Sequence, residues 1–261
     1  MNKGDPGVAS NLWVFGPLVR LNKRFSVRRK LDVAPHNLWI EGPLFARQGD
    51  KVTCRICFGH HFRVEGTLNP ETLSVWLAPP GEDKIPLNPR ENGNSVSVEF
   101  VPQIKGTHTI LVAYRAGMWS ITRDGRHLPG RRDKYPDIPV SRTVLFHHFA
   151  KTVIPVDEEI KWPGSFGLDL EIVPLSYLRE ELELLVQYGG KPLRGAKIYA
   201  QNREEERSRI GRTDAEGKAM MILPPGDWLI ITHAQDKPAG DVNDYDERLL
   251  TAVLTLRVAG R

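Results

Sequence analysis

The 261-residue sequence has only two cysteines and no apolar run near the ~18 residues that a membrane-spanning helix needs. Two thiols are too few for a disulfide scaffold and too few to form a tetrahedral zinc site by themselves. The missing apolar run excludes a polytopic membrane protein. The sequence also shows no export signal, because its most apolar early stretch, residues 12–18, is interrupted by Gly16 and Pro17.

Net charge is scarce over most of the chain. Residues 1–34 carry seven Lys and Arg against two Asp and hold +5, whereas the whole chain carries +4, so the other 227 residues come to −1. A nucleic-acid-binding protein needs a basic stripe on its folded part. The basic excess here lies in a leader, at Arg20, Lys23, Arg24, Arg28, Arg29 and Lys30. We therefore expect residues 1–34 to be a flexible basic leader and expect no nucleic-acid partner.

Common enzyme signatures are missing as well. The sequence has no G-x-S-x-G elbow, no G-x-x-x-x-G-K-[ST] loop, no strand-linked G-x-G-x-x-G and no H-E-x-x-H. These absences argue against the common hydrolases, nucleotide enzymes and zinc proteases. An iron dioxygenase would need a Tyr/His set, and the spacing of Tyr114, Tyr135, His147 and His148 does not indicate one. We expect no enzymatic activity.

From residue 36 onward, apolar and polar residues alternate with period two in short runs separated by Gly- and Pro-rich loops. This pattern is typical of sandwiches built from short antiparallel strands. Strands are predicted in the first half over residues 36–41, 51–58, 72–78, 95–100, 106–115 and 144–153. In the second half they are predicted over residues 168–173, 182–188, 197–201, 207–213, 218–223, 228–233 and 249–258. The one helix-like run, 176–183, is also compatible with a lead into a strand.

A polar segment separates the two sets of strands. Residues 156–166 combine acidic residues, Pro and Gly, which is typical of a linker between domains. We therefore predict an all-β protein with two immunoglobulin- or transthyretin-like β-sandwich domains, at 36–155 and 167–259. The polar stretch 121–136 is too long for a tight hairpin and is expected to run over the surface of the first domain.

Histidine is the residue type that suggests a site, because imidazole is the usual ligand of nickel, cobalt, copper and zinc. The eight histidines are His36, His60, His61, His108, His127, His147, His148 and His233. Neighbours in a strand point to opposite faces, so only one residue of each adjacent pair would face a given site unless a turn intervenes. Gly59 favours such a turn beside His60. For any single histidine, and for His108, His127 and His233 in particular, a structural or exposed role is the competing interpretation.

The pair Cys54 and Cys57 is a weaker metal or redox signal. Positions i and i+3 of a strand face opposite sides and lie ~10 Å apart, beyond the ~7 Å limit for a disulfide. We expect two buried or half-buried thiols.

Several short motifs follow one another in a characteristic order. In the first half they are His36-Asn-Leu-Trp-Ile-Glu41, Gly49-Asp-Lys-Val52, Gly59-His60, Ala116-Gly-Met-Trp-Ser120, Asp124-Gly125 and Phe149-Ala-Lys151. In the second half they are Leu170-Glu-Ile-Val-Pro-Leu175, Gly190-Lys-Pro-Leu-Arg-Gly-Ala196, Thr213-Asp-Ala-Glu-Gly217, Pro225-Gly-Asp-Trp228 and Ala252-Val-Leu-Thr-Leu256. This order resembles a family of periplasmic proteins that are commonly described as nickel- or cobalt-uptake accessory proteins.

The resemblance implies a secreted protein of two β-sandwich domains, periplasmic or at the cell surface, that binds nickel or cobalt and assists its uptake. In typical members a histidine opens the mature chain, and His36 matches it, while His60 matches the family's Gly-His element. Because residues 1–35 precede His36 here, its nitrogen is an ordinary amide unless the leader is removed, so we expect His36 to act through its imidazole.

The resemblance and the local chemistry together predict a reversible site for a divalent transition metal. Its predicted ligands are His36 and His60, helped by one of His61, His147 and His148 and by Glu41. The expected partners are the metal ion and a membrane metal transporter. The alternative is a structural or protein-interaction module in which the histidines are incidental and scattered. Clustering of imidazoles in the fold distinguishes the two.

Overall fold

The computed structural model describes residues 36–205, 208–236 and 245–258, which lie within one compact unit. The predicted leader, residues 1–34, falls outside the described residues. Nearly all regular structure in the described part is β-strand, and only two short 3-10 turns, η1 (Pro70–Thr72) and η2 (Arg132–Lys134), are helical. The prediction of an all-β fold is confirmed.

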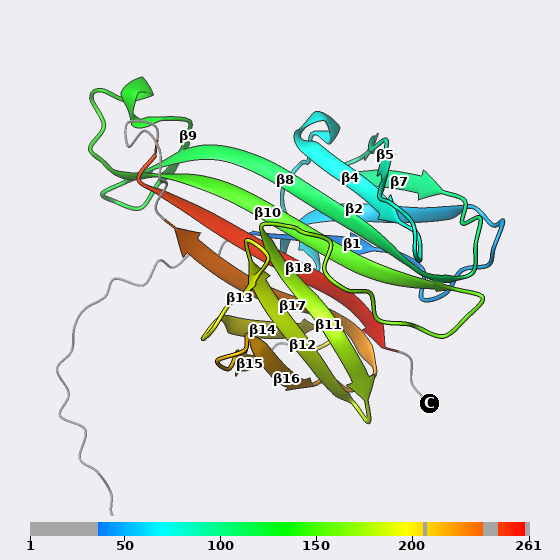
Figure 1. Ribbon diagram of the computed structural model, residues 1–261. Helices are drawn as coiled ribbons and strands as arrows, with labels where there is room; N and C mark the ends of the chain where they lie inside the picture. The colour runs from blue at the N-terminus through cyan, green and yellow to red at the C-terminus, as the bar shows by residue number, and fades with distance from the viewer. Residues whose placement is uncertain (1–35, 206–207, 237–244, 259–261) are drawn as a thin grey trace, which may run out of the picture. The chain divides into compact units, whose positions relative to one another are not determined.

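The strands form three sheets (Figure 1). The first sheet has the order β1-β2-β7-β6, with β3 paired to β2. Its strands are β1 (Asn37–Glu41), β2 (Val52–His60), β3 (Arg63–Val64), β6 (Arg90–Asn92) and β7 (Ser95–Phe100). The third sheet has the order β11-β12-β13, with β16 paired to β12. Its strands are β11 (Leu170–Leu178), β12 (Glu181–Tyr188), β13 (Lys191–Pro192) and β16 (Lys218–Ile222).

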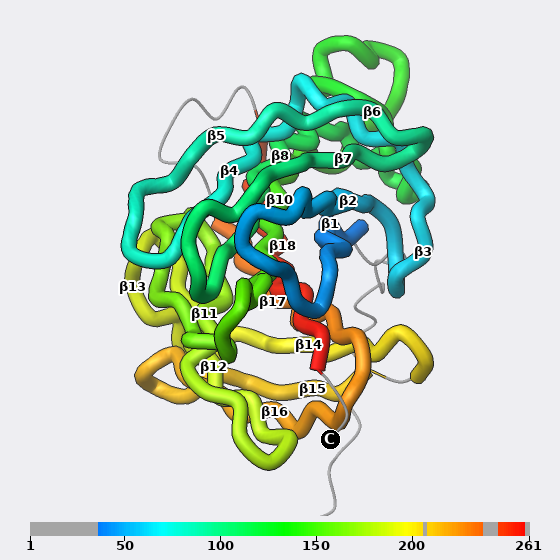
Figure 2. The backbone as a smooth tube through the Cα atoms, turned by 90° about the vertical axis from the view of Figure 1, so that its right-hand side faces the viewer, coloured from blue at the N-terminus to red at the C-terminus, as the bar shows by residue number. Residues whose placement is uncertain are grey.

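The second, central sheet has nine strands in the order β15-β14-β17-β18-β10-β8-β4-β5, with β9 paired to β8. Those from the first half of the chain are β4 (Leu73–Ala78), β5 (Ile85–Leu87), β8 (Gly106–Thr122), β9 (His127–Pro129) and β10 (Val140–Val156). Those from the second half are β14 (Lys197–Asn202), β15 (Arg209–Arg212), β17 (Gly226–Asp236) and β18 (Glu247–Val258). Strands β10 and β18 pair in parallel and join the two halves, and Figure 2 shows them between the first sheet and strands β11 to β16.

The other two sheets cover opposite faces of the central sheet. On β10, Ala150 and Ile154 pack in a core with β1, β2 and β7. Phe149 and Val153, their neighbours along the strand, pack in another core with β11, β12 and β17. Because alternate residues of a strand point to opposite faces, β10 contributes to both cores.

The predicted division into two domains stays a prediction. The segment that follows β10, residues 157–169, contains no strand, as a linker would, and each half builds most of one core. The halves nevertheless share the central sheet, and a smaller cluster packs Trp39 and Cys57 of the first half against Leu229, Ile231 and Val253 of the second.

Several strands differ in length from the predictions. Strands β8 and β10 are 17 residues each, longer than the predicted 106–115 and 144–153, because they form one long hairpin that includes part of the polar stretch 121–136. The helix-like run 176–183 is a hairpin whose turn residues, Arg179 and Glu180, both have positive φ.

Both predictions about the cysteine pair are confirmed. Cys54 and Cys57 are free and buried, and they point into different cores from opposite faces of β2. Burial raises the pKa of each thiol to about 12, so both stay protonated and unreactive at neutral pH.

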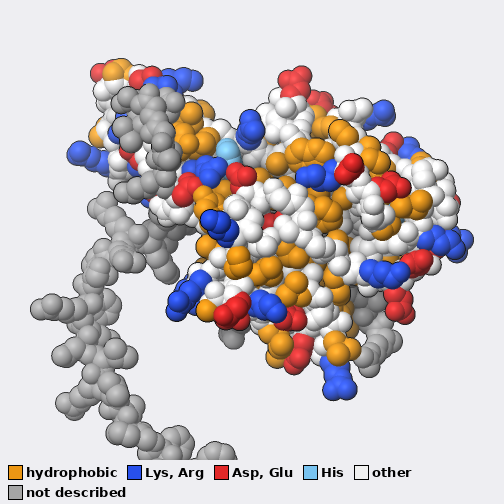
Figure 3. Space-filling view, in the orientation of Figure 1, with side chains coloured by type: hydrophobic (Ala, Val, Ile, Leu, Met, Phe, Trp, Pro, Cys, Tyr) orange, Lys and Arg blue, Asp and Glu red, His pale blue; other side chains and the backbone are white. Residues whose placement is uncertain are grey.

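Two surface properties complete the description. No helix among the described residues is long and apolar enough to cross a membrane. On the face shown in Figure 3, acidic and basic side chains are intermixed with apolar ones, as the near-neutral charge of residues 35–261 leads one to expect.

Candidate functional site

Three side chains that could bind a metal converge at one end of the first sheet. His36, His60 and Glu65 each offer one ligand atom, and these atoms lie within 4.8 Å of one another. The two imidazole rings are 4.4 Å apart between centroids. Glu65 Oε2 lies 2.5 Å from His60 Nδ1 and 3.7 Å from His36 Nε2. Two histidines expected from the sequence are therefore brought together, with a carboxylate that the sequence reasoning did not identify.

Strand register brings these residues together. Strand β1 pairs antiparallel with β2 so that Asn37 lies opposite Gly59, and continuing the register by one residue sets His36 opposite His60. Strand β3 then returns along β2, and the Glu65 amide donates to the Phe58 carbonyl at 3.0 Å. Glu65 is thus a diagonal neighbour of His60, and diagonal neighbours lie within reach of long side chains.

The turn between β2 and β3 has a strained backbone. Its two turn residues, His61 and Phe62, have φ of 48° and 61°. Two successive positive φ angles characterise the type I′ turn, for which Asn-Gly is preferred, so each of these larger residues costs about 1–3 kcal/mol. Gly59 has φ of 155°, and a Cβ there would lie 2.1 Å from the Arg63 carbonyl oxygen. The Gly-His element therefore needs its glycine.

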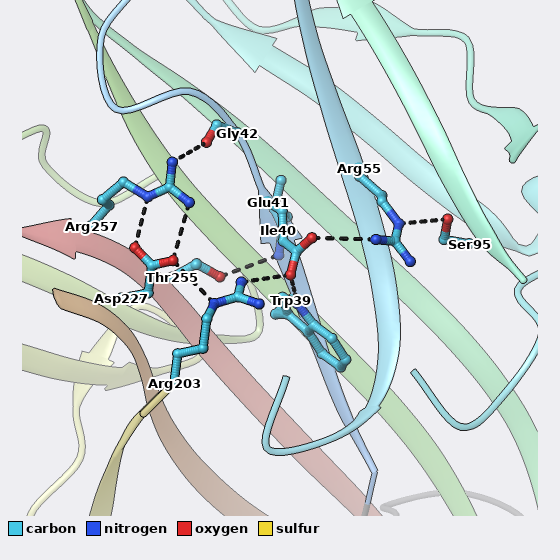
Figure 4. A network of polar contacts seen from close by, with 10 residues as sticks. All are labelled: Trp39, Ile40, Glu41, Gly42, Arg55, Ser95, Arg203, Asp227, Thr255 and Arg257. Carbon is cyan, nitrogen blue, oxygen red and sulfur yellow. Dashed lines mark hydrogen bonds and ion pairs between the residues drawn. The ribbon is translucent and has the colours of Figure 1, made fainter. Parts of the chain in front are cut away.

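Contacts with Trp39 and with the second half of the chain stabilise this turn. The Phe62 ring packs edge-on against Trp39, with centroids 6.1 Å apart. The guanidinium carbon of Arg203 lies 4.1 Å from the Phe62 centroid. Figure 4 shows that Arg203 in turn pairs with Glu41 at 2.7 Å and with Asp227 at 3.1 Å.

The electrostatics favour a neutral imidazole and an ionised carboxylate. Burial, and then the neighbouring His60, lower the pKa of His36. The hydrogen bond with His60 is the main cause that lowers the pKa of Glu65. An ionised carboxylate can only accept, so His60 Nδ1–H donates to it. Carboxylates orient metal-binding imidazoles in this way in many metal sites.

His148 is close to the cluster but separated from it by an aromatic ring. It lies on β10 and is only 3% exposed. Its ring is 5.2 Å from the Phe58 ring, and His36 packs 4.9 Å from the same Phe58 ring. Burial lowers the pKa of His148 to about 3.

The other predicted ligands lie elsewhere. His147 follows the opposite face of β10, where its ring contacts Phe149. His61 occupies the strained turn. Glu41 ends β1, about 16 Å along the strand from His36, and it pairs with Arg55 and Arg203. None of these three belongs to the cluster found among the described residues.

The spacing of the hairpin was the missed signal for Glu65. A glycine before His60 and a two-residue turn after it place Glu65, five positions later, on the same face as His60. The turn and the histidines were predicted from the sequence, whereas Glu65 was not.

Comparison with known proteins places the chain in a family. No curated protein matches the sequence. The family model described as a domain of unknown function, DUF4198, matches residues 33–236, which is more than half of the chain and includes the His36, His60 and Glu65 cluster. The chain therefore belongs to the DUF4198 family.

Proposed function

We propose that this protein is a non-enzymatic, extracytoplasmic metal-binding protein that holds a divalent transition metal ion at His36, His60 and Glu65 and assists its uptake. The observation that carries the proposal is the convergence of two imidazoles and one carboxylate from β1, β2 and the end of β3. An interaction module would be expected to have scattered histidines, whereas His36 and His60 lie side by side.

The donor set suits a borderline transition metal. Two imidazole nitrogens and one carboxylate oxygen favour nickel, copper or zinc over magnesium and calcium. Nickel and cobalt are our preferred ions because of the resemblance to uptake accessory proteins. The side chains of His36 and Glu65 are 39% and 43% exposed, which lets an ion enter and leave without unfolding. Such access suits capture and transfer to a membrane transporter.

Calorimetric titration with Ni²⁺ and Co²⁺ at pH 7.5 tests the proposal. We expect wild-type affinity in the micromolar range or tighter and a loss of about 100-fold or more in a variant with His36→Ala and His60→Ala. His147→Ala, on the opposite face of β10, is the matched control and should bind as the wild type does. Undiminished binding by the double variant would rule out this site.

The site should also respond to acid. Imidazoles must be deprotonated to bind, so affinity is expected to fall below about pH 6. Because the pKa of His36 is lowered, its own protonation contributes only below the usual range of histidine. Repeating the titration between pH 7.5 and 5 measures this, and an affinity that does not change with pH would argue against imidazole ligands.

A further inference from the structure

One face of the central sheet, the face covered by the first sheet, carries a row of polar residues close to the candidate metal site. Strand pairing sets Tyr114 of β8 opposite His148 of β10, His148 opposite Thr251 of β18, and Thr251 opposite His233 of β17. Paired residues share a face of the sheet. The row faces the first sheet, because Phe58 of β2 contacts both Tyr114, at 5.4 Å, and His148, at 5.2 Å.

Within this row, His148 differs from His233 in its hydrogen bonding. His233 Nδ1 lies 3.0 Å from the Thr251 hydroxyl. His148 Nδ1 is buried and has no hydrogen-bond partner among the described residues. A buried polar group without a partner costs about 1–3 kcal/mol, so an apolar side chain of similar shape would be expected to give a more stable fold. The packing of the His148 ring against Phe58 and Tyr114 therefore makes no use of this nitrogen.

The surroundings of His148 give its imidazole the character of a metal ligand. Burial lowers the pKa of His148 to about 3, so the ring is neutral near pH 7 and one of its nitrogens carries a lone pair. Ring contacts connect it to the outer cluster, because the Phe58 ring lies 5.2 Å from the His148 ring and 4.9 Å from the His36 ring. A single aromatic side chain, Phe58, thus contacts both the buried His148 ring and the proposed ligand His36.

The Phe58 ring packs between several neighbours, among them His36, Tyr114 and His148. It is part-buried at the end of the sandwich, and its ring edge faces Gly66. A Cβ at Gly66 would lie 3.1 Å from Phe58 Cδ1, closer than ordinary van der Waals contact, so any larger residue there would push against the ring. Because this ring contacts both His36 and His148, it would have to move for the two imidazoles to bind one ion.

We propose that His148 is an inner metal ligand, which joins the ion held by His36, His60 and Glu65 when the Phe58 ring turns aside. The inference rests on the proposed function and deepens it by adding a third imidazole from the facing sheet. The ion would then link the first sheet to the central sheet. The ion would first bind at the exposed residues His36, His60 and Glu65. Binding by His148 would then hold it more tightly and in a less exposed position.

X-ray absorption of the Ni²⁺-loaded protein, which counts imidazole ligands, tests the inference together with calorimetric titration by Ni²⁺. We expect three imidazoles in the wild type and two in His148→Leu, with a loss of affinity of about tenfold or more. His148→Gln, which keeps a polar side chain, should lose affinity equally. His233→Asn, in the same row, is the matched control and should keep three imidazoles and wild-type affinity.

The outcomes separate the two proposals. Thermal unfolding of the metal-free proteins should show His148→Leu to be at least as stable as the wild type, so that its lost affinity is not a folding defect. If the wild type binds nickel through two imidazoles and His148→Leu binds equally well, the inner ligand is overturned and the outer site stands. If the wild type binds no nickel, both proposals are overturned.

Discussion

At the scale of single residues, Glu65 has two possible tasks in a metal site. It could bind the ion directly, or it could orient His60 through the 2.5 Å contact with Nδ1. Both tasks use the negative charge, but they differ in what an uncharged replacement retains. A glutamine keeps a carbonyl oxygen that can accept from Nδ1, whereas it is a poor ligand for a divalent transition metal.

We therefore predict that Glu65→Gln separates the two tasks. If Glu65 orients His60, nickel affinity should fall by about 10-fold, since the carbonyl still accepts but the imidazole loses basicity. Glu65→Ala should then lose more, because it also removes the acceptor. Calorimetric titration measures both variants, with Glu71→Gln as the exposed control outside the cluster. Equal losses in the two variants would assign Glu65 to direct coordination.

At the scale of elements, the hairpin of β2 and β3 depends on contacts that are distant in sequence. Its turn residues have positive φ without being glycine or asparagine, so the local sequence alone does not favour this backbone. The ring of Phe62 contacts both Trp39 and the Arg203 guanidinium, and these contacts offset that cost. A residue from the second half of the chain thus contacts the turn that follows His60.

Removing the contact of Arg203 with Phe62 should loosen the metal site without changing a proposed ligand. We predict that Arg203→Ala lowers nickel affinity by about 3- to 10-fold, since the exposed cation–π contact and its ion pairs stabilise by about 1 kcal/mol. Hydrogen exchange of the Glu65 amide, which donates to the Phe58 carbonyl, should become faster in the metal-free protein.

Two further variants test whether the effect of Arg203→Ala is specific to its contact with Phe62. Arg209→Ala removes a similar stacking contact, on Trp228, and should leave both readouts unchanged. Adding Phe62→Gly to Arg203→Ala should restore slow exchange, because glycine adopts a positive φ without strain. If the Glu65 amide still exchanged slowly in Arg203→Ala, the turn would not depend on the contact between Arg203 and Phe62.

The elements also show what local sequence can and cannot predict. Alternation predicted most strands, including β1 and β2, because burial of one face is recorded in every second residue. The same signal does not say which strands pair, so the parallel pairing of β10 with β18 was not predicted. Likewise, the pairing of His36 with His60 was reached through a family resemblance, whereas Glu65 needed the register of the hairpin.

At the scale of the whole molecule, one buried ion pair ties the segment after β10 to the central sheet. Lys151 of β10 and Glu171 of β11 are 3% and 1% exposed, and Lys151 Nζ lies 2.8 Å from Glu171 Oε1. The same carboxylate accepts from the Ser165 hydroxyl and from the amides of Phe166 and Gly167. Burial by itself would raise the pKa of Glu171, but Lys151 and these donors hold it below its usual range.

Breaking this pair should weaken the connection between the two halves. We predict that Lys151→Met destabilises the fold by about 3–5 kcal/mol, because it leaves a buried carboxylate without its cation. Lys161→Met is the matched control: its pair with Glu158 is exposed, so its loss should cost less than about 1 kcal/mol. Denaturant unfolding followed by tryptophan fluorescence measures both.

A second substitution shows whether the charge itself is responsible. Combining Lys151→Met with Glu171→Gln leaves no buried charge while keeping an acceptor for the amides of Phe166 and Gly167, so part of the lost stability should return. Because β10 lies between β8 and β18 in one sheet, unfolding of every variant should remain a single transition. Two separate transitions in Lys151→Met would show instead that the halves fold independently and that the ion pair is what couples them.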